Sequence, residues 1–261
     1  MVIHNNNSLS IAVCPSAADL YDKAMNLSRK LSIPLLLKET QEYDFFLIYS
    51  AEGLALKQTG KNSLGPIMVS FTTPLMTYRI KHGGGRRQAL ARAVGLKKGW
   101  QPTVLDATAG LGRDGFILAC LGCQVHMIER SPILAVMLED ALQKAEKSEQ
   151  TAEIIKKSLR FTHMDSSDYL QNLQPENYPD VIYLDPMYPE RTKSSLVKKE
   201  MRMLRLLTGD DQDATELLSL ALACVRNRVV IKRPRLAKTL SSLKPSHQIT
   251  GKTSRFDVYL I

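Results

Sequence analysis

The sequence has little of what marks a secreted, membrane-bound or disulfide-stabilised protein. Four of its 261 residues are cysteine, and no apolar run approaches the length of a membrane-spanning helix, about 20 residues. The first residues, MVIHNNNSLS, contain neither the basic segment nor the apolar segment of a signal peptide. We therefore expect a cytoplasmic protein without a membrane anchor.

The cysteines are also too scattered for a metal site. Cys120 and Cys123 form a C-x-x-C pair, but no second pair of Cys or His residues stands at zinc-binding spacing. Cys120 falls in an apolar segment, where a thiol packs as a small hydrophobic side chain. We expect buried thiols and no bound metal ion.

Acidic residues are fewer than basic ones. Lys and Arg number 35 and Asp and Glu 26, so the formal net charge is +9. This excess favours a polyanionic partner such as nucleic acid, although it does not identify one. Residues 77–98 carry basic side chains and no acidic one, and they include Arg86 and Arg87 after a flexible HGGG sequence. These two arginines are candidate phosphate contacts, and a solvated linker is the alternative.

Residues 103–130 predict a strand, a glycine-rich turn, a helix and a second strand. Gly110, Gly112 and Gly115 stand where the backbone must turn tightly and approach a ligand closely. Glu129 ends the second strand, at the position where a nucleotide-binding α/β unit meets the ribose. The alternative for Glu129 is a strand-end charge in solvent.

The glycine pattern alone fits either NAD or S-adenosylmethionine. Asp106 precedes the turn and Asp114 follows it, so an anionic pyrophosphate would meet two like charges. A zwitterionic sulfonium compound suits the turn better, because its amino group can meet either carboxylate and its carboxylate can meet Arg113 or a backbone N–H. S-adenosylmethionine is therefore the predicted cofactor. A non-methylating Rossmann protein that binds NAD is the alternative from a different class.

A later strand, predicted at residues 159–162, leads to Asp165 and Ser166. Ligands of open α/β sheets bind where parallel strands end. Asp165 is therefore a candidate acceptor for the adenine amino group, with Ser166 beside it. The alternative is that Asp165 caps a helix beginning near residue 167.

The sequence DPMYP at residues 185–189 follows another predicted strand and indicates chemistry on an amino group. Asp185 and the carbonyl of Pro186 can accept both hydrogens of a planar exocyclic amine, and Tyr188 offers a face to a base. Such an amine is a poor nucleophile because its lone pair is delocalised into the ring. Two acceptors turn that lone pair toward the methyl group and stabilise the charge that develops on nitrogen. Asp-Pro also begins ordinary turns, so the motif gains its meaning from the cofactor turn before it.

Together these residues resemble the class I S-adenosylmethionine-dependent methyltransferases, specifically the amino-methylating group with an N/D-P-P-Y/F loop, in which Met187 here replaces the second proline. The sequences DATAGLGRDGF, YLDPMYP and SLVKKEMR are similar to those of the bacterial RsmJ family. That family methylates the N2 amino group of a guanine in small-subunit ribosomal RNA. The resemblance implies cofactor contacts by Arg113, Asp114, Glu129, Arg130, Asp165, Ser166 and Asp185.

Basic residues that follow the DPMYP loop are further candidates for RNA contact. Residues 196–207 predict a helix that carries Lys198, Lys199 and Arg202, and Lys232 and Arg233 begin a basic loop after a strand predicted at residues 228–231. Each group is either a solvated surface or a contact with the RNA backbone.

The whole pattern predicts an α/β protein with two domains. Residues 1–75 predict a small α/β domain with one helix, and residues 76–261 predict a Rossmann-like methyltransferase domain with a seven-stranded, mostly parallel sheet. The resemblance implies methylation of guanine N2 in small-subunit ribosomal RNA, free or in the assembling subunit, with Asp185, Pro186 and Tyr188 as the predicted catalytic residues. An N-methyltransferase acting on DNA or tRNA is the alternative within the same chemistry.

Overall fold

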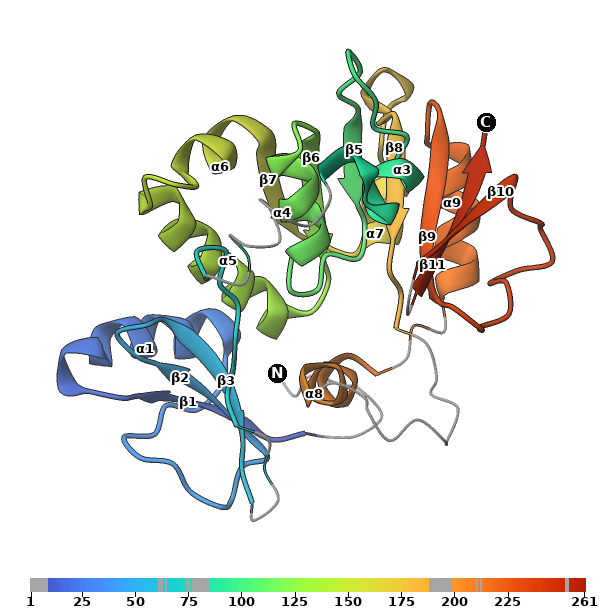
Figure 1. Ribbon diagram of the computed structural model, residues 1–261. Coiled ribbons are helices and arrows are strands. Elements are labelled where there is room, and N and C mark those ends of the chain that lie inside the picture. The colour runs from blue at the N-terminus through green and yellow to red at the C-terminus, as the bar shows by residue number, and fades with distance from the viewer. Residues whose placement is uncertain are drawn as a thin grey trace. The chain divides into compact units, whose positions relative to one another are not determined.

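The computed structural model describes residues 9–60, 63, 65–73, 76, 85–187, 199–209, 211, 213–251 and 254–261. The chain forms two compact units, whose helices and strands are labelled in Figure 1. The first contains Met1–Val69, Val136–Ala141 and Met187–Asp211, and the second contains Ser70–Ala135, Leu142–Pro186 and Gln212–Ile261.

The first unit is built on a four-stranded sheet in the order β1-β2-β3-β4. β1 (Ile11–Pro15) runs parallel to β2 (Phe45–Tyr49), whereas β3 (Leu54–Gln58) and β4 (Ile67–Met68) are antiparallel to their neighbours. Aromatic and β-branched residues, such as the sequence FFLIY of β2, fit the pleated surface of such a sheet. The short helix Ala18–Leu20 and α1 (Tyr21–Leu31) follow β1, and α8 (Lys199–Thr208) belongs to the same unit. The α/β arrangement expected near the N-terminus is present.

The second unit is built on a seven-stranded sheet in the order β10-β11-β9-β8-β5-β6-β7. Its strands are β5 (Thr103–Asp106), β6 (Gln124–Glu129), β7 (Leu159–His163), β8 (Val181–Leu184), β9 (Arg228–Pro234), β10 (His247–Thr250) and β11 (Ser254–Leu260). Strands β5 to β9 are parallel, and β11 is antiparallel to both β9 and β10. The seven-stranded, mostly parallel sheet predicted from the sequence is confirmed.

Helices pack on both faces of this sheet (Figure 1). They are the short helix Gly85–Arg87, α3 (Ala89–Ala93), α4 (Arg113–Cys120), α5 (Pro132–Lys147), α6 (Ala152–Ser158), α7 (Ser166–Gln171), the short helix Pro175–Asn177 and α9 (Ala214–Ala223). α4 contacts β6 and α6, whereas α7 contacts α9 and α9 contacts β9. Every residue of β8 is buried, as expected for a central strand of a sheet that is covered on both faces.

The strand order places a ligand-binding edge at the carboxyl ends of β5 and β8. The chain passes from β5 outward through β6 to β7 and then returns to β8 on the other side of β5. Ligands of open α/β sheets bind at such a switch point, beyond the carboxyl ends of the strands. Because β5, β6 and β8 are parallel, Asp106, Glu129 and Asp185 come to the same edge.

β9 is longer than the sequence predicts. It extends to Pro234, because β11 pairs with it along its whole length and Phe256 lies opposite Lys232. The prediction that Lys232 and Arg233 begin a loop is therefore wrong, and both residues lie in a strand. No helix in the described part of the chain combines the length and apolarity needed to cross a membrane.

Candidate functional site

The glycine-rich turn between β5 and α4 is fixed by hydrogen bonds to the strands on either side. The Ala107 N–H donates to the carbonyl of Tyr183 in β8, and the Ala109 N–H donates to the carbonyl of Ile128 in β6, both at 3.0 Å. Gly110 and Gly112 have φ angles of 55° and 68°, in the left-handed region that favours glycine. The turn therefore offers rigid backbone at the switch point of the sheet.

Gly115 allows α4 to approach the sheet closely. A Cβ atom at this position would lie 2.7 Å from the Met127 Sδ atom in β6 and 3.0 Å from Asp106 Oδ2. Glycine is required at this position because the helix packs closely against the sheet. The third glycine of nucleotide-binding turns has the same role.

Glu129 lies beside the turn and accepts two backbone hydrogen bonds. Its Oε2 accepts from the Gly110 N–H at 2.8 Å, and its Oε1 accepts from the Ser131 N–H at 2.7 Å. The residue is 7% exposed, so the alternative of a strand-end charge in solvent is wrong. The ribose contact of Glu129 stays a prediction.

Asp106 lies beneath the turn rather than at its surface. The residue is 1% exposed, and burial, followed by the charge of Asp114, raises its pKa from 3.8 to about 8. Its Oδ1 accepts a 3.3 Å hydrogen bond from the Thr108 N–H. The carboxyl group is buried at this edge, and the expected contact of Asp106 with the cofactor amino group stays a prediction.

Asp185 follows β8 and is joined to the same turn. Its N–H donates to the Thr108 hydroxyl at 2.5 Å. Pro186 after it is buried, whereas Tyr188 lies outside the described residues. The sequence gives no sign of the Thr108 contact, because it depends on how two distant strand ends meet.

The chain after Pro186 is held by a reciprocal pair of hydrogen bonds within the first unit. The Met187 N–H donates to Asp211 Oδ2 at 2.6 Å, and the Asp211 N–H donates to the Met187 carbonyl at 3.0 Å. Asp211 thus fixes the residue that replaces the second proline of the N/D-P-P-Y/F loop.

Lys232 places a positive charge between two of the predicted site residues. Its Nζ lies 2.8 Å from Asp114 Oδ2 and 2.6 Å from Asp185 Oδ2. Burial lowers the pKa of Lys232, but the Asp185 and Asp114 charges outweigh that effect and raise the pKa above its ordinary value. The Tyr183 hydroxyl also donates to Asp114 Oδ2, at 2.8 Å. Neither Tyr183 nor this role of Lys232 is evident from the sequence, where a lysine before an arginine resembles an RNA contact.

Arg130, Asp165 and Ser166 lie at the ends of β6 and β7. The Arg130 Nη1 atom lies 2.5 Å from Asp213 Oδ2 and 3.8 Å from Asp165 Oδ2. Asp165 caps α7 by accepting from the Ser167 N–H at 2.8 Å, which confirms the capping alternative. The Ser166 hydroxyl donates to the Ala107 carbonyl at 2.6 Å, so it holds α7 to the glycine-rich turn. Their cofactor contacts stay predictions.

Among the described residues of the second unit, the predicted RNA-binding residues do not form one group. Arg233 is 6% exposed and donates to the Lys238 carbonyl, so its predicted phosphate contact does not fit its position. Arg86 is close enough to Cys123 for its charge to lower that thiol's pKa against the larger effect of burial, which raises it to about 12. Cys123 precedes β6, so Arg86 lies toward the edge opposite Glu129. Arg202 is exposed on α8. Lys198 and the Lys199 side chain lie outside the described residues.

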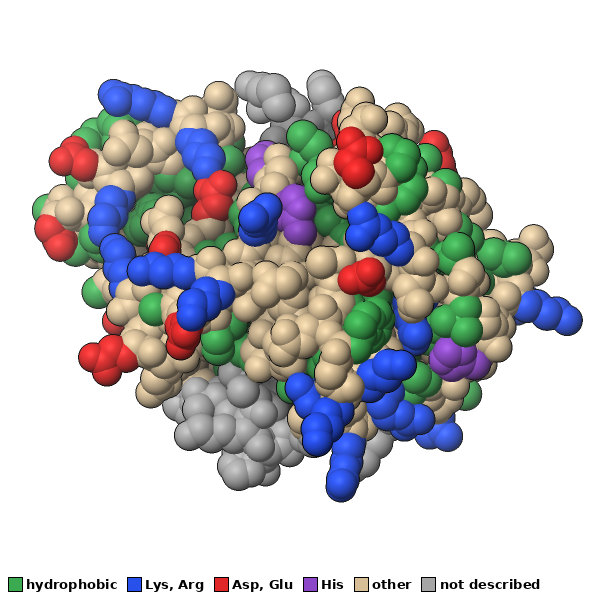
Figure 2. All heavy atoms as spheres, turned by 90° about the horizontal axis from the view of Figure 1, so that it is seen from above, with side chains coloured by type: hydrophobic (Ala, Val, Ile, Leu, Met, Phe, Trp, Pro, Cys, Tyr) green, Lys and Arg blue, Asp and Glu red, His purple; other side chains and the backbone are tan. Residues whose placement is uncertain are grey.

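Positive charge is spread over the one face of the molecule that Figure 2 shows. On the face shown in Figure 2, Lys and Arg side chains lie at many places, with Asp and Glu side chains among them. Cys123 is buried and Cys120 is partly buried, and burial raises both thiol pKa values to about 12, so both remain protonated at neutral pH. No group of three or more metal-binding side chains occurs within the described residues.

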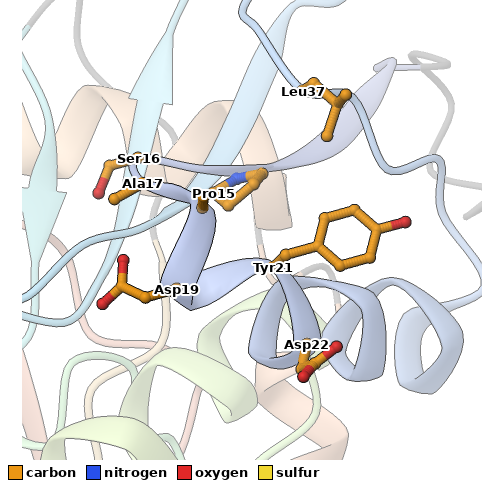
Figure 3. A pocket seen from close by; sticks show the side chains of 8 residues that line it. Pro15, Ser16, Ala17, Asp19, Tyr21, Asp22 and Leu37 are labelled. Atoms are coloured by element: carbon orange, nitrogen blue, oxygen red, sulfur yellow. The ribbon is translucent and has the colours of Figure 1, made fainter.

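A separate hollow lies in the first unit, where β1 meets the short helix Ala18–Leu20 (Figure 3). Its volume is about 780 Å³, and Ser16, Asp19, Tyr21, Asp22 and Leu37 are among the residues that line it. None of the predicted site residues lines this hollow.

Comparisons with known proteins agree on one family. Residues 30–261 match the SAM-dependent methyltransferase family SAM_MT. The chain is 48% identical to ribosomal RNA small subunit methyltransferase J of Thioalkalivibrio sulfidiphilus, covering 96% of this chain and 97% of the relative. It is 46% identical to the protein of the same name from Cellvibrio japonicus, with 95% of each chain covered. Among solved structures, the SAM-dependent methyltransferase NGO1261 of Neisseria gonorrhoeae is 31% identical and covers 96% of each chain with a TM-score of 0.73.

Proposed function

Because the chain belongs to the SAM-dependent methyltransferase family that includes ribosomal RNA small subunit methyltransferase J, we propose that it methylates guanine N2 in small-subunit ribosomal RNA. The observation that carries the proposal is the placement of Asp185 at the switch point of the sheet, joined through Thr108 to the glycine-rich turn. This arrangement supports a role for Asp185 as the acceptor for the target amine, next to the glycine-rich turn.

The chemistry of the edge fits S-adenosylmethionine, which supplies an activated methyl group on a sulfonium. Gly110 and Gly112 bring backbone close to the ligand, and Asp114 and Glu129 provide carboxylates for its amino and hydroxyl groups. Arg113, the first residue of α4, would bind the cofactor carboxylate. The residues present therefore match the charges of the cofactor.

Asp185 orients the amine and stabilises the reaction as it proceeds. A carboxylate that accepts a hydrogen bond from the exocyclic nitrogen turns its lone pair toward the methyl group. Positive charge grows on that nitrogen during the transfer, so the interaction with Asp185 strengthens toward the transition state. The Pro186 carbonyl and the Tyr188 ring have their predicted roles in holding the base.

We place the RNA contact of this edge on the loop that follows β9, in place of Lys232 and Arg233. Arg235 and Lys238 are exposed, and the Leu236 side chain between them is 87% exposed. Two buried arginines fix the backbone of this loop: Arg255 donates to the Arg235 carbonyl at 3.1 Å, and Arg233 donates to the Lys238 carbonyl. A loop with a fixed backbone and two exposed cations suits contact with a phosphate backbone.

We also propose that residues 1–75 form a separate domain and that the protein acts in the cytoplasm, where it meets ribosomal RNA or the assembling subunit.

Methyl transfer to unmodified small-subunit RNA, small subunits, tRNA and DNA would test the proposed substrate. Nucleoside analysis by mass spectrometry should find N2-methylguanosine in the ribosomal substrate alone. Methylation of DNA or tRNA instead would favour the alternative substrates, and the absence of transfer to any of them would contradict the proposal.

A further inference from the structure

Lys232 joins two parts of the site that are far apart in the sequence. Leu184 in β8 lies opposite Ile231 in β9, so Asp185 and Lys232 each follow directly after a paired residue of two parallel strands. The same Nζ atom reaches Asp114 in the first turn of α4. One ammonium group therefore binds the Asp114 carboxylate at the start of α4 and the Asp185 carboxylate after β8.

This contact is sheltered compared with an ordinary surface ion pair. The side chains of Lys232 and Asp114 are 29% and 13% exposed, and that of Asp185 is 38% exposed. An ammonium group has three donors in a flexible arrangement, so it can bind two carboxylates at once. The cost of holding a lysine here is offset by the two hydrogen bonds, whereas two adjacent carboxylates without the cation would repel each other.

We infer that Lys232 is a positioning residue for methyl transfer. It acts through Asp185 and not through a contact with RNA. Its ammonium holds the Asp185 carboxylate in the orientation that receives the target amine and fixes that orientation relative to Asp114 at the start of α4. The inference rests on the proposed function. Since the cation opposes the positive charge that develops on the target nitrogen, its benefit to the reaction comes from orientation and from keeping both carboxylates ionised.

The test compares Lys232→Met, Lys232→Arg, Asp185→Asn and the double variant Lys232→Met/Asp185→Asn. We expect Lys232→Met to lower the single-turnover rate by about 10–100-fold, the scale at which misplaced groups lose catalysis. RNA affinity should stay within twofold of that of the wild type. The acidic limb of the pH–rate profile should move to higher pH, because Lys232, against the larger effect of burial, lowers the pKa of Asp106 and binds Asp114 and Asp185, and all three carboxyl groups lose that charge in the variant.

Two further outcomes separate positioning from a general structural effect. Lys232→Arg should recover part of the rate, since it retains the charge with a different geometry. The double variant should be no slower than the slower single variant, because both changes remove the same interaction. Lys98→Met, at an exposed lysine before β5, is the matched control and should behave as the wild type.

Additive losses in the double variant, an unchanged rate in Lys232→Met, or a defect confined to RNA affinity would overturn the inference. Thermal melting establishes that each variant is folded. If Lys232→Met does not fold, Lys232→Arg carries the test through its rate, pH profile and cycle with Asp185→Asn. A wild-type protein that methylates no RNA would contradict the proposed function and this inference together, whereas an active wild type with an unaffected Lys232→Met would contradict this inference alone.

Discussion

Carboxylates at the ends of neighbouring strands have different environments in this protein. Asp106 is buried with a raised pKa, Glu129 is held by two backbone N–H groups, and Asp185 is bound by an ammonium group. All three are acidic residues at strand ends. Their environments therefore differ because other parts of the chain supply different neighbours. Each environment leads to a separate experimental expectation.

Asp106 should make the folded protein less stable as the pH rises. Its folded pKa of about 8 lies above the ordinary value of 3.8, so the native state holds an extra proton between these two values. Stability linked to this proton is present at low pH and is lost as the pH rises through the interval. Asp106→Asn cannot ionise, so the variant should gain melting temperature relative to the wild type between pH 5 and pH 8, by on the order of a few degrees. Differential scanning calorimetry at both pH values measures this, and a constant difference between the two proteins would contradict the raised pKa.

Asp185→Ala should separate catalysis from binding. Loss of one oriented group that acts in the transition state costs about 10²–10³-fold in rate, whereas RNA affinity depends mainly on phosphate contacts. Asp185→Asn retains one acceptor oxygen and the shape of the side chain, so we expect it to keep partial activity. Single-turnover methylation and RNA binding are measured on both variants. Full activity in Asp185→Ala, or a defect in RNA binding alone, would show that Asp185 does not position the amine.

At the scale of elements, Glu129 connects the end of β6 to the glycine-rich turn. Its replacement by Ala should weaken S-adenosylmethionine binding by about 1–3 kcal/mol, the cost of leaving hydrogen-bonding groups unpaired. Glu129→Gln retains an acceptor for one of the two backbone N–H groups, at Gly110 or at Ser131, and should lose less affinity. Isothermal titration calorimetry on folded variants measures both. Equal affinity in the wild type and Glu129→Ala would remove Glu129 from the ribose site.

The elements that could be predicted from the sequence are those that depend on local pattern. The strand, turn and helix around Gly110 follow from short-range spacing, and so does the strand before Asp185. The length of β9 could not be predicted, because it depends on pairing with β11, about 20 residues later in the chain. For the same reason the sequence does not indicate that Lys232 pairs with two acidic residues, because they lie 118 and 47 residues away along the chain.

Asp165 is a residue for which the sequence supports two predictions, a helix cap and an adenine contact, and the structure confirms the cap. Its backbone position before α7 and its carboxylate both suit helix capping, and the cap is made through Oδ1. A sequence pattern for a cap and one for a ligand contact at a strand end therefore coincide here. Arg130, by contrast, finds Asp213 through a contact between segments 83 residues apart, which no local pattern indicates.

At the scale of the whole molecule, the excess positive charge is meaningful only through its location. Arg235 and Lys238 follow the carboxyl end of β9, at the edge that holds Asp185. Lys97 and Lys98 precede β5 and lie toward the other edge, and Arg86 lies near the start of β6. A net charge of +9 steers RNA toward the protein from any direction, but contacts that place the target base must come from the edge with the cofactor turn.

The salt dependence of RNA binding should distinguish these groups. Each lysine or arginine that contacts a phosphate contributes roughly 0.7–0.9 to the slope of log affinity against log salt. Arg235→Ala/Lys238→Ala should therefore flatten the slope by up to twice that amount and lower methylation at limiting RNA. Lys97→Ala/Lys98→Ala, which removes the same charge from the other edge, should leave the slope unchanged. Arg86→Ala/Arg87→Ala tests whether the RNA extends to that edge, since only a phosphate contact there would flatten its slope. Equal slopes for the wild type and the Arg235/Lys238 variant would show that the loop after β9 is merely solvated and that the RNA approaches Asp185 over another surface.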